Sequence, residues 1–249
     1  YKLDPDTIKI ARAREVMEYQ MSTSKLDYWH WVDALYMVMP VMVKMYDITK
    51  NPLYLEKLHQ YLTVTDSIMY DREVGLYYRD AKYPYPFHKT INGKKDFWSR
   101  GDGWAFAAFA KVLKQLPAED KYREEYITRF QTMAKSIAAC QQPEGYWTRS
   151  LIDPEQAPGP ETSGTALFTY GFLWGINNGL LNADIYSPIV EKAWNYLKTT
   201  ALQADGKIGY IQPVGEKAIP GQVVDANSCF NFGIGAFLLA ACERVRFLQ

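Results

Sequence analysis

The chain has 249 residues, which is enough for one large domain or two small ones. Its 28 Lys and Arg side chains balance 28 Asp and Glu side chains, so the formal net charge is zero. That balance argues against a general nucleic-acid binder and against a polybasic membrane-binding surface. No uninterrupted apolar stretch approaches the roughly 18 residues that a membrane-spanning helix needs. Three scattered cysteines are too few for a disulfide framework or a Cys-x-x-Cys metal site.

Aromatic residues are the unusual feature of the composition, because 7 Trp, 19 Tyr and 11 Phe make up 15% of the chain. Such an excess suits a concave surface that stacks on the flat or apolar faces of a ligand, such as sugar rings. An aromatic-rich helical core explains the excess equally well. Composition and cysteines leave both a periplasmic and a cytoplasmic location in a bacterial-type cell open.

A helical period dominates the chain. Predicted helices span residues 8–19, 33–46, 51–69, 103–116, 119–140, 164–177, 188–202 and 230–245. Three short extended pieces, each opened by a glycine, recur at residues 75–78, 145–147 and 206–210. Each leads through a loop into a Gly-rich, strongly apolar helix, so one unit repeats along the chain.

The predicted helices are of two kinds. Residues 119–140 and 188–202 show a polar face, as an outer ring would, whereas residues 104–113, 165–176 and 231–241 are apolar around most of their surface, as an inner ring would be. This alternation predicts an all-α fold, an α/α toroid formed by residues 1–249 as a single domain. An open α-solenoid is the rival, but long aromatic loops on one side favour a closed cup with a site at its mouth.

The helix count falls short of a closed toroid. About eight helices are expected in this chain, and a closed six-hairpin toroid has twelve, so we expect the chain to lack its N-terminal hairpins. An inner helix without its ring neighbours would expose more apolar surface than monomers normally do. We expect Tyr36, Met39 and Val43 to be the side chains exposed in this way.

The densest chemical cluster runs from residue 28 to residue 37, where four aromatic residues and His30 surround Asp33 at the start of an inner-type helix. The plain interpretation is that Asp33 caps this helix and interacts favourably with its dipole. A carboxyl group walled by Trp and Tyr is also partly desolvated, which raises its pKa and lets it hold a proton near neutral pH. Asp33 is therefore a candidate general acid, and His30 is the histidine nearest to it in the sequence.

A second cluster, residues 97–104, sets Arg100 between Trp98 and Trp104. Arg is the natural partner of a carboxylate through a bidentate pair, and two indoles would provide a stacking wall; a capped helix start is the plain alternative. Residues 158–165 and 225–229 precede the next two inner helices, so all four clusters would share one rim. No His/Asp spacing suggests a metal, no Gly-x-Ser-x-Gly marks a serine hydrolase, and no P-loop is present, so no cofactor is expected.

Four motifs occur in the order of a known family: WVDALYM at 31–37, WSRGDGW at 98–104, QQPEGYW at 141–147 and ETSG at 161–164. With these motifs the chain, from about residue 4 to its C-terminus, resembles glycoside hydrolase family 105, the unsaturated rhamnogalacturonyl hydrolases. The resemblance implies an (α/α)6 barrel, a six-hairpin toroid. It also implies removal of a 4,5-unsaturated uronic acid from the non-reducing end of oligosaccharides that pectin lyases or related polysaccharide lyases leave.

The resemblance implies roles for individual residues. In the family, an Asp protonates C4 of the enol-ether double bond, water adds at C5, and the resulting hemiketal opens and expels the neighbouring sugar. By motif position, Asp33 matches that acid/base. Substrate-lining positions of the family are matched by Trp31, Met37, Trp98, Arg100 and Trp104.

The chain departs from the family pattern in two places. Many members have a His after the Gly-Leu-aromatic strand, where this chain has Arg79, so Arg79 is a candidate contact to a different sugar. The family also has a second active-site Asp upstream of the segment that matches residues 8–19, and no residue here matches it.

Other function classes stay open on the sequence. The enzyme alternative is another α/α-barrel glycosidase or a polysaccharide lyase, which would need a Tyr or His base near a charge-neutralising group, and His30 with Arg100 could fill those roles. The alternative without catalysis is a helical carbohydrate-binding protein. An oligosaccharide is the expected partner, no nucleic acid or membrane is expected, and the oligomeric state is not predicted.

Overall fold

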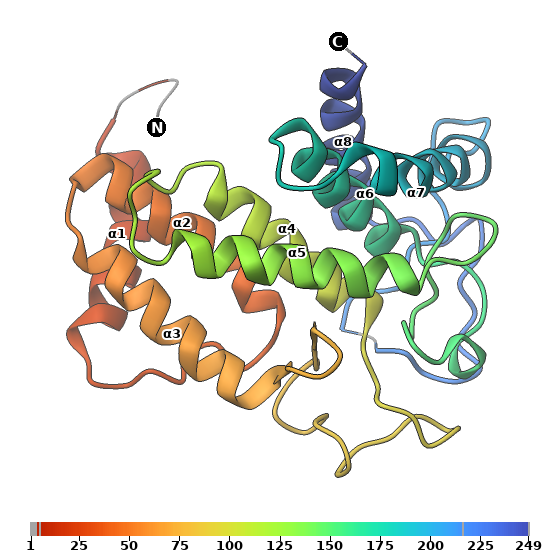
Figure 1. Ribbon diagram of the computed structural model, residues 1–249, viewed down its shortest axis with the longest axis horizontal. Coiled ribbons are helices and arrows are strands. Elements are labelled where there is room, and N and C mark those ends of the chain that lie inside the picture. Colours follow the sequence, from red (N-terminus) through yellow and green to blue (C-terminus); the bar gives the residue numbers. More distant parts are fainter. Residues whose placement is uncertain (1–3, 5, 216, 249) are drawn as a thin grey trace.

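A computed structural model describes residue 4, residues 6–215 and residues 217–248 of the chain (Figure 1). Within these residues the chain forms eight α-helices and one short antiparallel β-hairpin. The helices are α1 (Ile8–Ser22), α2 (Asp33–Thr49), α3 (Leu53–Met69), α4 (Ser99–Leu113), α5 (Arg123–Ala139), α6 (Thr162–Asn177), α7 (Ala183–Tyr196) and α8 (Asn231–Phe247). The hairpin joins β1 (Tyr70–Asp71) to β2 (Leu76–Tyr77), a 3-10 turn spans Pro154–Gln156, and a π-helical turn, Leu197–Ala201, extends α7.

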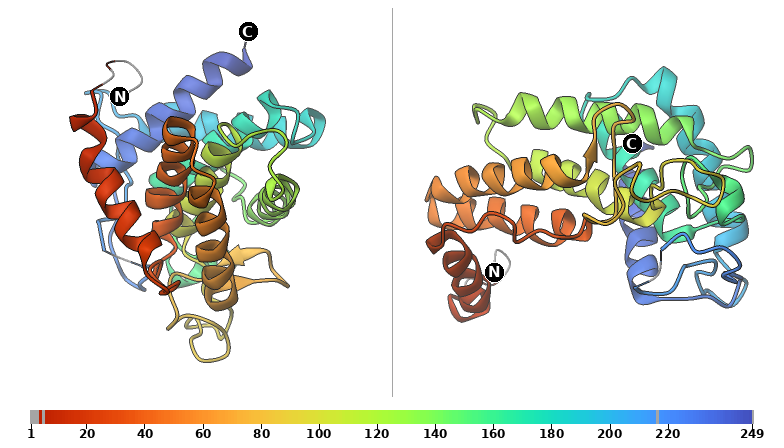
Figure 2. Two further views of the ribbon diagram at one scale, coloured as in Figure 1. Left: turned by 90° about the vertical axis from the view of Figure 1, so that its left-hand side faces the viewer. Right: turned by 90° about the horizontal axis from the view of Figure 1, so that it is seen from below.

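The helices form an inner and an outer layer, as the alternating sequence pattern predicts. α2, α4, α6 and α8 pack side by side in that order, while α3, α5 and α7 cover α2, α4 and α6 from outside (Figures 1 and 2). α1 packs against α2 and α3. Nearly every side chain of α4 and α6 is buried, whereas the outer helices keep exposed polar side chains.

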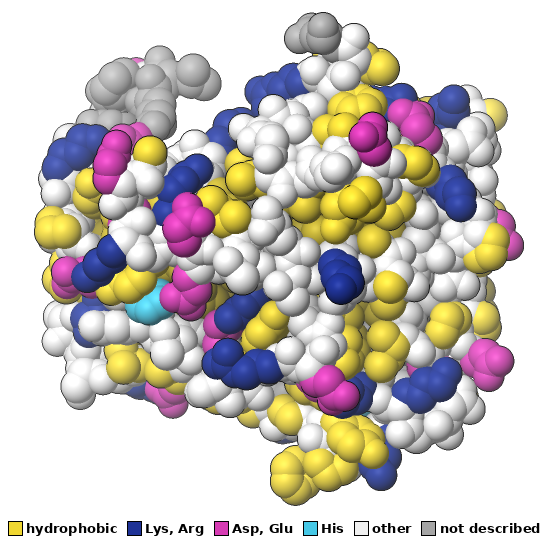
Figure 3. Space-filling view, in the orientation of Figure 1, with side chains coloured by type: hydrophobic (Ala, Val, Ile, Leu, Met, Phe, Trp, Pro, Cys, Tyr) yellow, Lys and Arg dark blue, Asp and Glu magenta, His cyan; other side chains and the backbone are white. Residues whose placement is uncertain are grey.

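The outer layer forms the face that Figure 3 shows. On this face, acidic and basic side chains are interspersed with apolar ones. The mixture of signs agrees with the balanced composition of the chain. In the part of the chain that the structure describes, no helix combines the length and the apolar character needed to cross a membrane.

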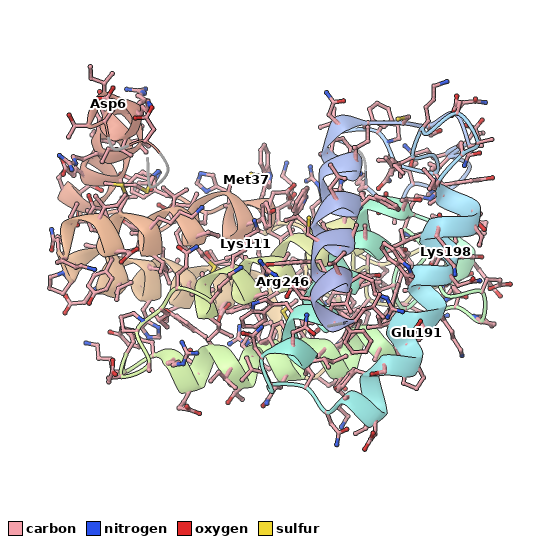
Figure 4. All side chains as sticks on the ribbon, turned by 90° about the horizontal axis from the view of Figure 1, so that it is seen from above. Asp6, Met37, Lys111, Glu191, Lys198 and Arg246 are labelled. Atoms are coloured by element: carbon pink, nitrogen blue, oxygen red, sulfur yellow. The ribbon has the colours of Figure 1, made fainter. Side chains whose placement is uncertain are left out.

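The inner layer is curved. Side chains of α2 and α8, which stand at the two ends of the packing order, line the same two pockets, so the ends of the layer face each other. One pocket lies at the N-terminal ends of the inner helices. The other, of about 200 Å³, is lined by Lys44, Lys111 and Arg246 among others, and Figure 4 labels the last two. The described residues thus form a curved double layer of eight helices, and not a closed ring of twelve.

The exposure predicted for α2 is mostly wrong. Met39 and Val43 are fully buried, because they belong to the same hydrophobic cluster as the side chains of α3 and α4. Tyr36 is half-buried against Trp104, with the ring centroids 4.5 Å apart. Met37 is the apolar side chain of this helix that does reach the surface, with 54% of its area exposed.

α4 begins at Ser99, four residues before the start predicted at Gly103. The glycine serves close helix packing and does not mark a turn, because a Cβ at Gly103 would lie only 3.0 Å from the Leu167 side chain of α6. The earlier start places Arg100 in the first turn of the helix. Its side chain is therefore held at the rim by a regular element and not by a loop.

Candidate active site

The N-terminal ends of α2, α4 and α8, together with residues 214–215, enclose a pocket of about 380 Å³. This volume is in the range of pockets that bind small molecules. The pocket brings together seven of the eight predicted site residues, which are Trp31, Asp33, Met37, Arg79, Trp98, Arg100 and Trp104. Val214, Gly215 and Phe232 complete the lining. Three of the four inner helices, α2, α4 and α8, thus contribute to one pocket at the predicted rim.

Asp33 is the first residue of α2. The segment before it is tied to the segment that follows β2, because Trp31 pairs with Asp80 in an isolated bridge and the Val32 amide donates to the Arg79 carbonyl at 3.0 Å. Burial raises the pKa of the Asp33 carboxyl, while its own backbone amide and the charges of Arg100 and Arg79 lower it by less. The net result is a carboxyl group that keeps its proton to a higher pH than an ordinary Asp.

Arg100 is buried, with 3% of its area exposed, and its guanidinium lies between two aromatic rings. The guanidinium carbon is 4.6 Å from the Trp98 ring centroid and 4.7 Å from that of Phe232. Nη1 donates to the carbonyl of Gln212 at 2.7 Å, and Nη2 donates to that of Pro213 at 2.8 Å. The terminal nitrogens of this side chain therefore hold the loop that carries Val214.

Arg79 approaches the same pocket from the irregular segment that follows β2, and it is half-buried. Its Nη1 donates to the Asp80 carboxylate. The guanidinium carbon lies 5.7 Å from the Trp31 ring centroid and 5.9 Å from the Tyr83 ring centroid. The Arg79 side chain is thus positioned at the pocket by the rings of Trp31 and Tyr83 and by the Asp80 carboxylate.

The aromatic walls differ in their exposure. Trp98 and Trp104 are buried, and the Trp98 indole N–H donates to the Gln212 side-chain oxygen at 2.8 Å. Trp31 is 58% exposed, so its ring remains available at the mouth of the pocket. A ring face at the mouth and fixed rings below it form a surface that can stack on a sugar.

His30 is the predicted site residue that the structure does not bring into the pocket, and its side chain is exposed. The physical reason is the β-bridge that the next residue, Trp31, forms with Asp80, because neighbouring side chains along a strand-like pairing point to opposite sides. Trp31 takes the side that faces the pocket. Val214, Gly215 and Phe232 were missed, and only the position of Phe232 at the start of the last inner helix offered a signal in the sequence.

The acids of the other clusters serve the fold. The Glu161 carboxylate caps α6, accepting from the amides of Ser163 at 3.2 Å and Gly164 at 2.6 Å, and also from the Gln212 amide at 3.1 Å. Asp102 is fully buried and accepts from the Tyr77 amide at 2.8 Å. Among the residues described, no group of three or more His, Cys, Asp or Glu side chains is placed to hold a metal ion.

Comparison with known proteins places the chain in a family. The model described as Glycosyl Hydrolase Family 88 matches residues 1–248. A curated relative from Formosa agariphila, named unsaturated 3S-rhamnoglycuronyl hydrolase, is 37% identical over 226 residues, which cover 89% of this chain. The chain spans 59% of the length of that relative.

Solved structures agree on the fold. One that is named as a polysaccharide lyase is 75% identical, with a TM-score of 0.97 over 100% of this chain and 70% of that chain. Another, described as a possible family 105 member from Salmonella enterica, is 22% identical, with a TM-score of 0.74 over 88% of this chain and 57% of that chain. At this identity the likeness is evidence for the fold alone. The predicted α/α-barrel class is confirmed. Because the family match runs almost from end to end, this chain belongs to the GH88/GH105 glycoside hydrolases, as its motifs predicted.

Proposed function

We propose that this site removes a 4,5-unsaturated uronic acid from the non-reducing end of lyase-generated oligosaccharides of the pectin or rhamnogalacturonan type. One observation carries the proposal: a carboxyl group with a raised pKa, Asp33, lies in an aromatic pocket beside two arginines. A proton donor, stacking walls and a cation are what an enol-ether uronide requires. The name of the Formosa agariphila relative points to the same substrate class.

The reaction begins with the protonated Asp33. Its proton adds to C4, and the electron pair of the C4–C5 double bond forms the new C–H bond. The positive charge that develops at C5 is shared with the ring oxygen, and a water molecule then adds at C5 and returns a proton to the Asp33 carboxylate. That proton return restores the acid for the next turnover, and the resulting hemiketal then opens and releases the neighbouring sugar.

The surroundings of Asp33 suit this acid role. Burial raises the pKa of its carboxyl and so favours the protonated form that donates. The charges of Arg79 and Arg100 act in the opposite direction and stabilise the carboxylate that the proton transfer leaves behind. Because burial favours the acid and the two arginines favour the carboxylate, Asp33 can both donate its proton and take one back.

A polysaccharide lyase is the second candidate, because the relative that is 75% identical is named as one. A lyase removes the C5 proton of a saturated uronide and expels the group at C4, which creates the same double bond. The base expected from the sequence, a Tyr or His, is absent from the described residues that line the pocket. Asp33 would have to act as that base in its ionised form, which its burial disfavours. The pocket therefore supports the hydrolase better.

The absorbance of the conjugated double bond tests both candidates in one experiment. The full-length protein is incubated with lyase-generated unsaturated oligosaccharides and, separately, with saturated uronic-acid polysaccharide. A hydrolase removes the ultraviolet absorbance of the first substrate. A lyase instead creates absorbance from the second, and that result would overturn the hydrolase proposal. A protein that binds both without changing either absorbance is a carbohydrate-binding protein.

A further inference from the structure

Two arginines approach the pocket, and each is close enough to Asp33 to lower the pKa of its carboxyl. Either could therefore neutralise the carboxylate of a uronide. Charge and proximity do not distinguish them, but their hydrogen bonds do. The sequence motif drew attention to Arg100, whereas the structure separates the two side chains by what they already hold.

Arg100 is already engaged by the protein. Both of its terminal nitrogens donate to main-chain carbonyls, of Gln212 at 2.7 Å and Pro213 at 2.8 Å. Its guanidinium lies between Trp98 and Phe232, and the Glu161 carboxylate is 4.0 Å from Nη1. A carboxylate ligand would have to displace two short hydrogen bonds, and the carbonyls left behind would lose their partners at a cost.

Those hydrogen bonds fix the pocket wall. The Gln212 side-chain oxygen accepts from the Trp98 indole at 2.8 Å, and the main-chain N–H of Gln212 donates to the Glu161 carboxylate at 3.1 Å. Residues 212–213 are thus fastened to the starts of α4 and α6, while Val214, two residues on, is 76% exposed at the pocket. Arg100 adds two hydrogen bonds to these contacts, one to each of the carbonyls that precede this exposed part of the loop.

Arg79 has the complementary arrangement. One terminal nitrogen, Nη1, is paired with Asp80, while Nε and Nη2 make no hydrogen bond to the described residues. The rings of Trp31 and Tyr83 flank its guanidinium. Its main chain is tied to the residue before Asp33, so the two groups keep a fixed relation. The Nε/Nη2 edge is the geometry that binds a carboxylate through two parallel hydrogen bonds.

We propose that Arg79 binds the carboxylate of the uronide and determines the preference for an acid, whereas Arg100 is a positioning residue that holds residues 212–215 as the pocket wall. This inference rests on the proposed function, because it assumes that the pocket takes a uronide. In that substrate the carboxylate is attached to C5, next to the carbon that Asp33 protonates. Binding of this carboxylate by Arg79 would thus place C4 at the acid.

The test compares an unsaturated uronide with its methyl ester, which keeps the double bond and loses the negative charge. The ratio of kcat/KM for the acid to that for the ester is measured on full-length protein. Arg79→Gln should reduce this ratio by about 10- to 100-fold, the usual value of hydrogen bonds to a charged group. Arg79→Lys should recover part of the loss, because it keeps the charge without the planar fork. Arg100→Gln should lower both values and leave the ratio unchanged.

Lys82→Gln is the matched control, because it removes an exposed positive charge three residues from Arg79 and outside the pocket lining. This variant should leave the ratio unchanged. If Arg100→Gln does not fold, as judged by its thermal melt, Arg100→Lys replaces it. A ratio that collapses in the Arg100 variant, or survives in Arg79→Gln, overturns the assignment.

Binding measurements separate this inference from the proposed function. Three tryptophans line the pocket, so quenching of their fluorescence reports the affinity for acid and ester without turnover. If the wild-type protein binds the acid but does not consume it, the proposed function fails. The Kd ratio of Arg79→Gln against Arg100→Gln then decides the roles of the two arginines in the same way.

Discussion

Replacing Asp33 with Asn should abolish most turnover and leave the fold intact. The amide has nearly the same shape as the carboxyl group, and Asp33 follows the N-cap residue Val32, so the substitution leaves the N-cap of α2 in place. It has no proton to give to C4, however. Loss of a general acid should lower kcat by roughly 10²- to 10⁴-fold. Substrate affinity should change far less, because the aromatic walls and both arginines remain.

The stability of this variant should move in the opposite direction from its activity. Burial raises the pKa of Asp33, so its contribution to stability is fully present below the unfolded pKa and is lost as the pH rises through the higher folded pKa. As the pH rises above the unfolded pKa, the wild-type protein progressively loses that contribution, whereas the neutral Asn side chain does not titrate. The melting temperature of the variant at pH 7 should therefore equal or exceed that of the wild type.

The assay follows the decay of ultraviolet absorbance in unsaturated oligosaccharides, with thermal melts of both proteins at the same pH. The wild-type rate should also fall as the pH rises through the raised pKa of Asp33, since only the protonated acid donates. Turnover that is unchanged in a folded Asp33→Asn protein would remove Asp33 from the mechanism. A variant that has lost activity because it melts far below the wild type would instead assign Asp33 a structural role.

Three further substitutions test the surrounding fold. Asp102→Asn should reduce the loss of melting temperature towards alkaline pH, because burial holds the pKa of the Asp102 carboxyl well above its usual value and its stabilising contribution is lost as the pH rises. Parallel plots of melting temperature against pH for the two proteins would contradict this. Glu161→Gln removes part of the α6 cap and should cost about 1–3 kcal/mol in urea unfolding, so an unchanged midpoint would refute the capping role. Gly145→Ala puts a Cβ 2.2 Å from the Lys192 carbonyl oxygen and should cost more than Gly179→Ala, which meets open space at a similar positive φ; equal losses would show that the close contact is unimportant.

Local sequence patterns were sufficient for the layer arrangement. Each of the eight predicted helices overlaps one of the eight helices formed by the described residues, because apolar spacing indicates which face of a helix is buried. The alternation of polar-faced and wholly apolar helices also identified the inner layer. The N-terminal ends of its helices then had to lie on one side, which is why the sequence predicts Asp33, Arg100 and Trp104 at one rim.

Tertiary structure decided what those side chains contact. Arg100 carries the same motif whether it binds a substrate carboxylate or the carbonyls of residues 212–213, more than a hundred positions away. Likewise, Asp33 and Glu161 both lie at helix starts, yet Asp33 lines an aromatic pocket, whereas the Glu161 carboxylate caps α6. Periodicity and motifs encode local conformation, whereas burial and hydrogen-bond partners depend on segments that meet only when the chain folds. For this reason the sequence predicts the helices and the rim of the site, whereas the burial and the contacts of its acids and arginines follow only from the fold.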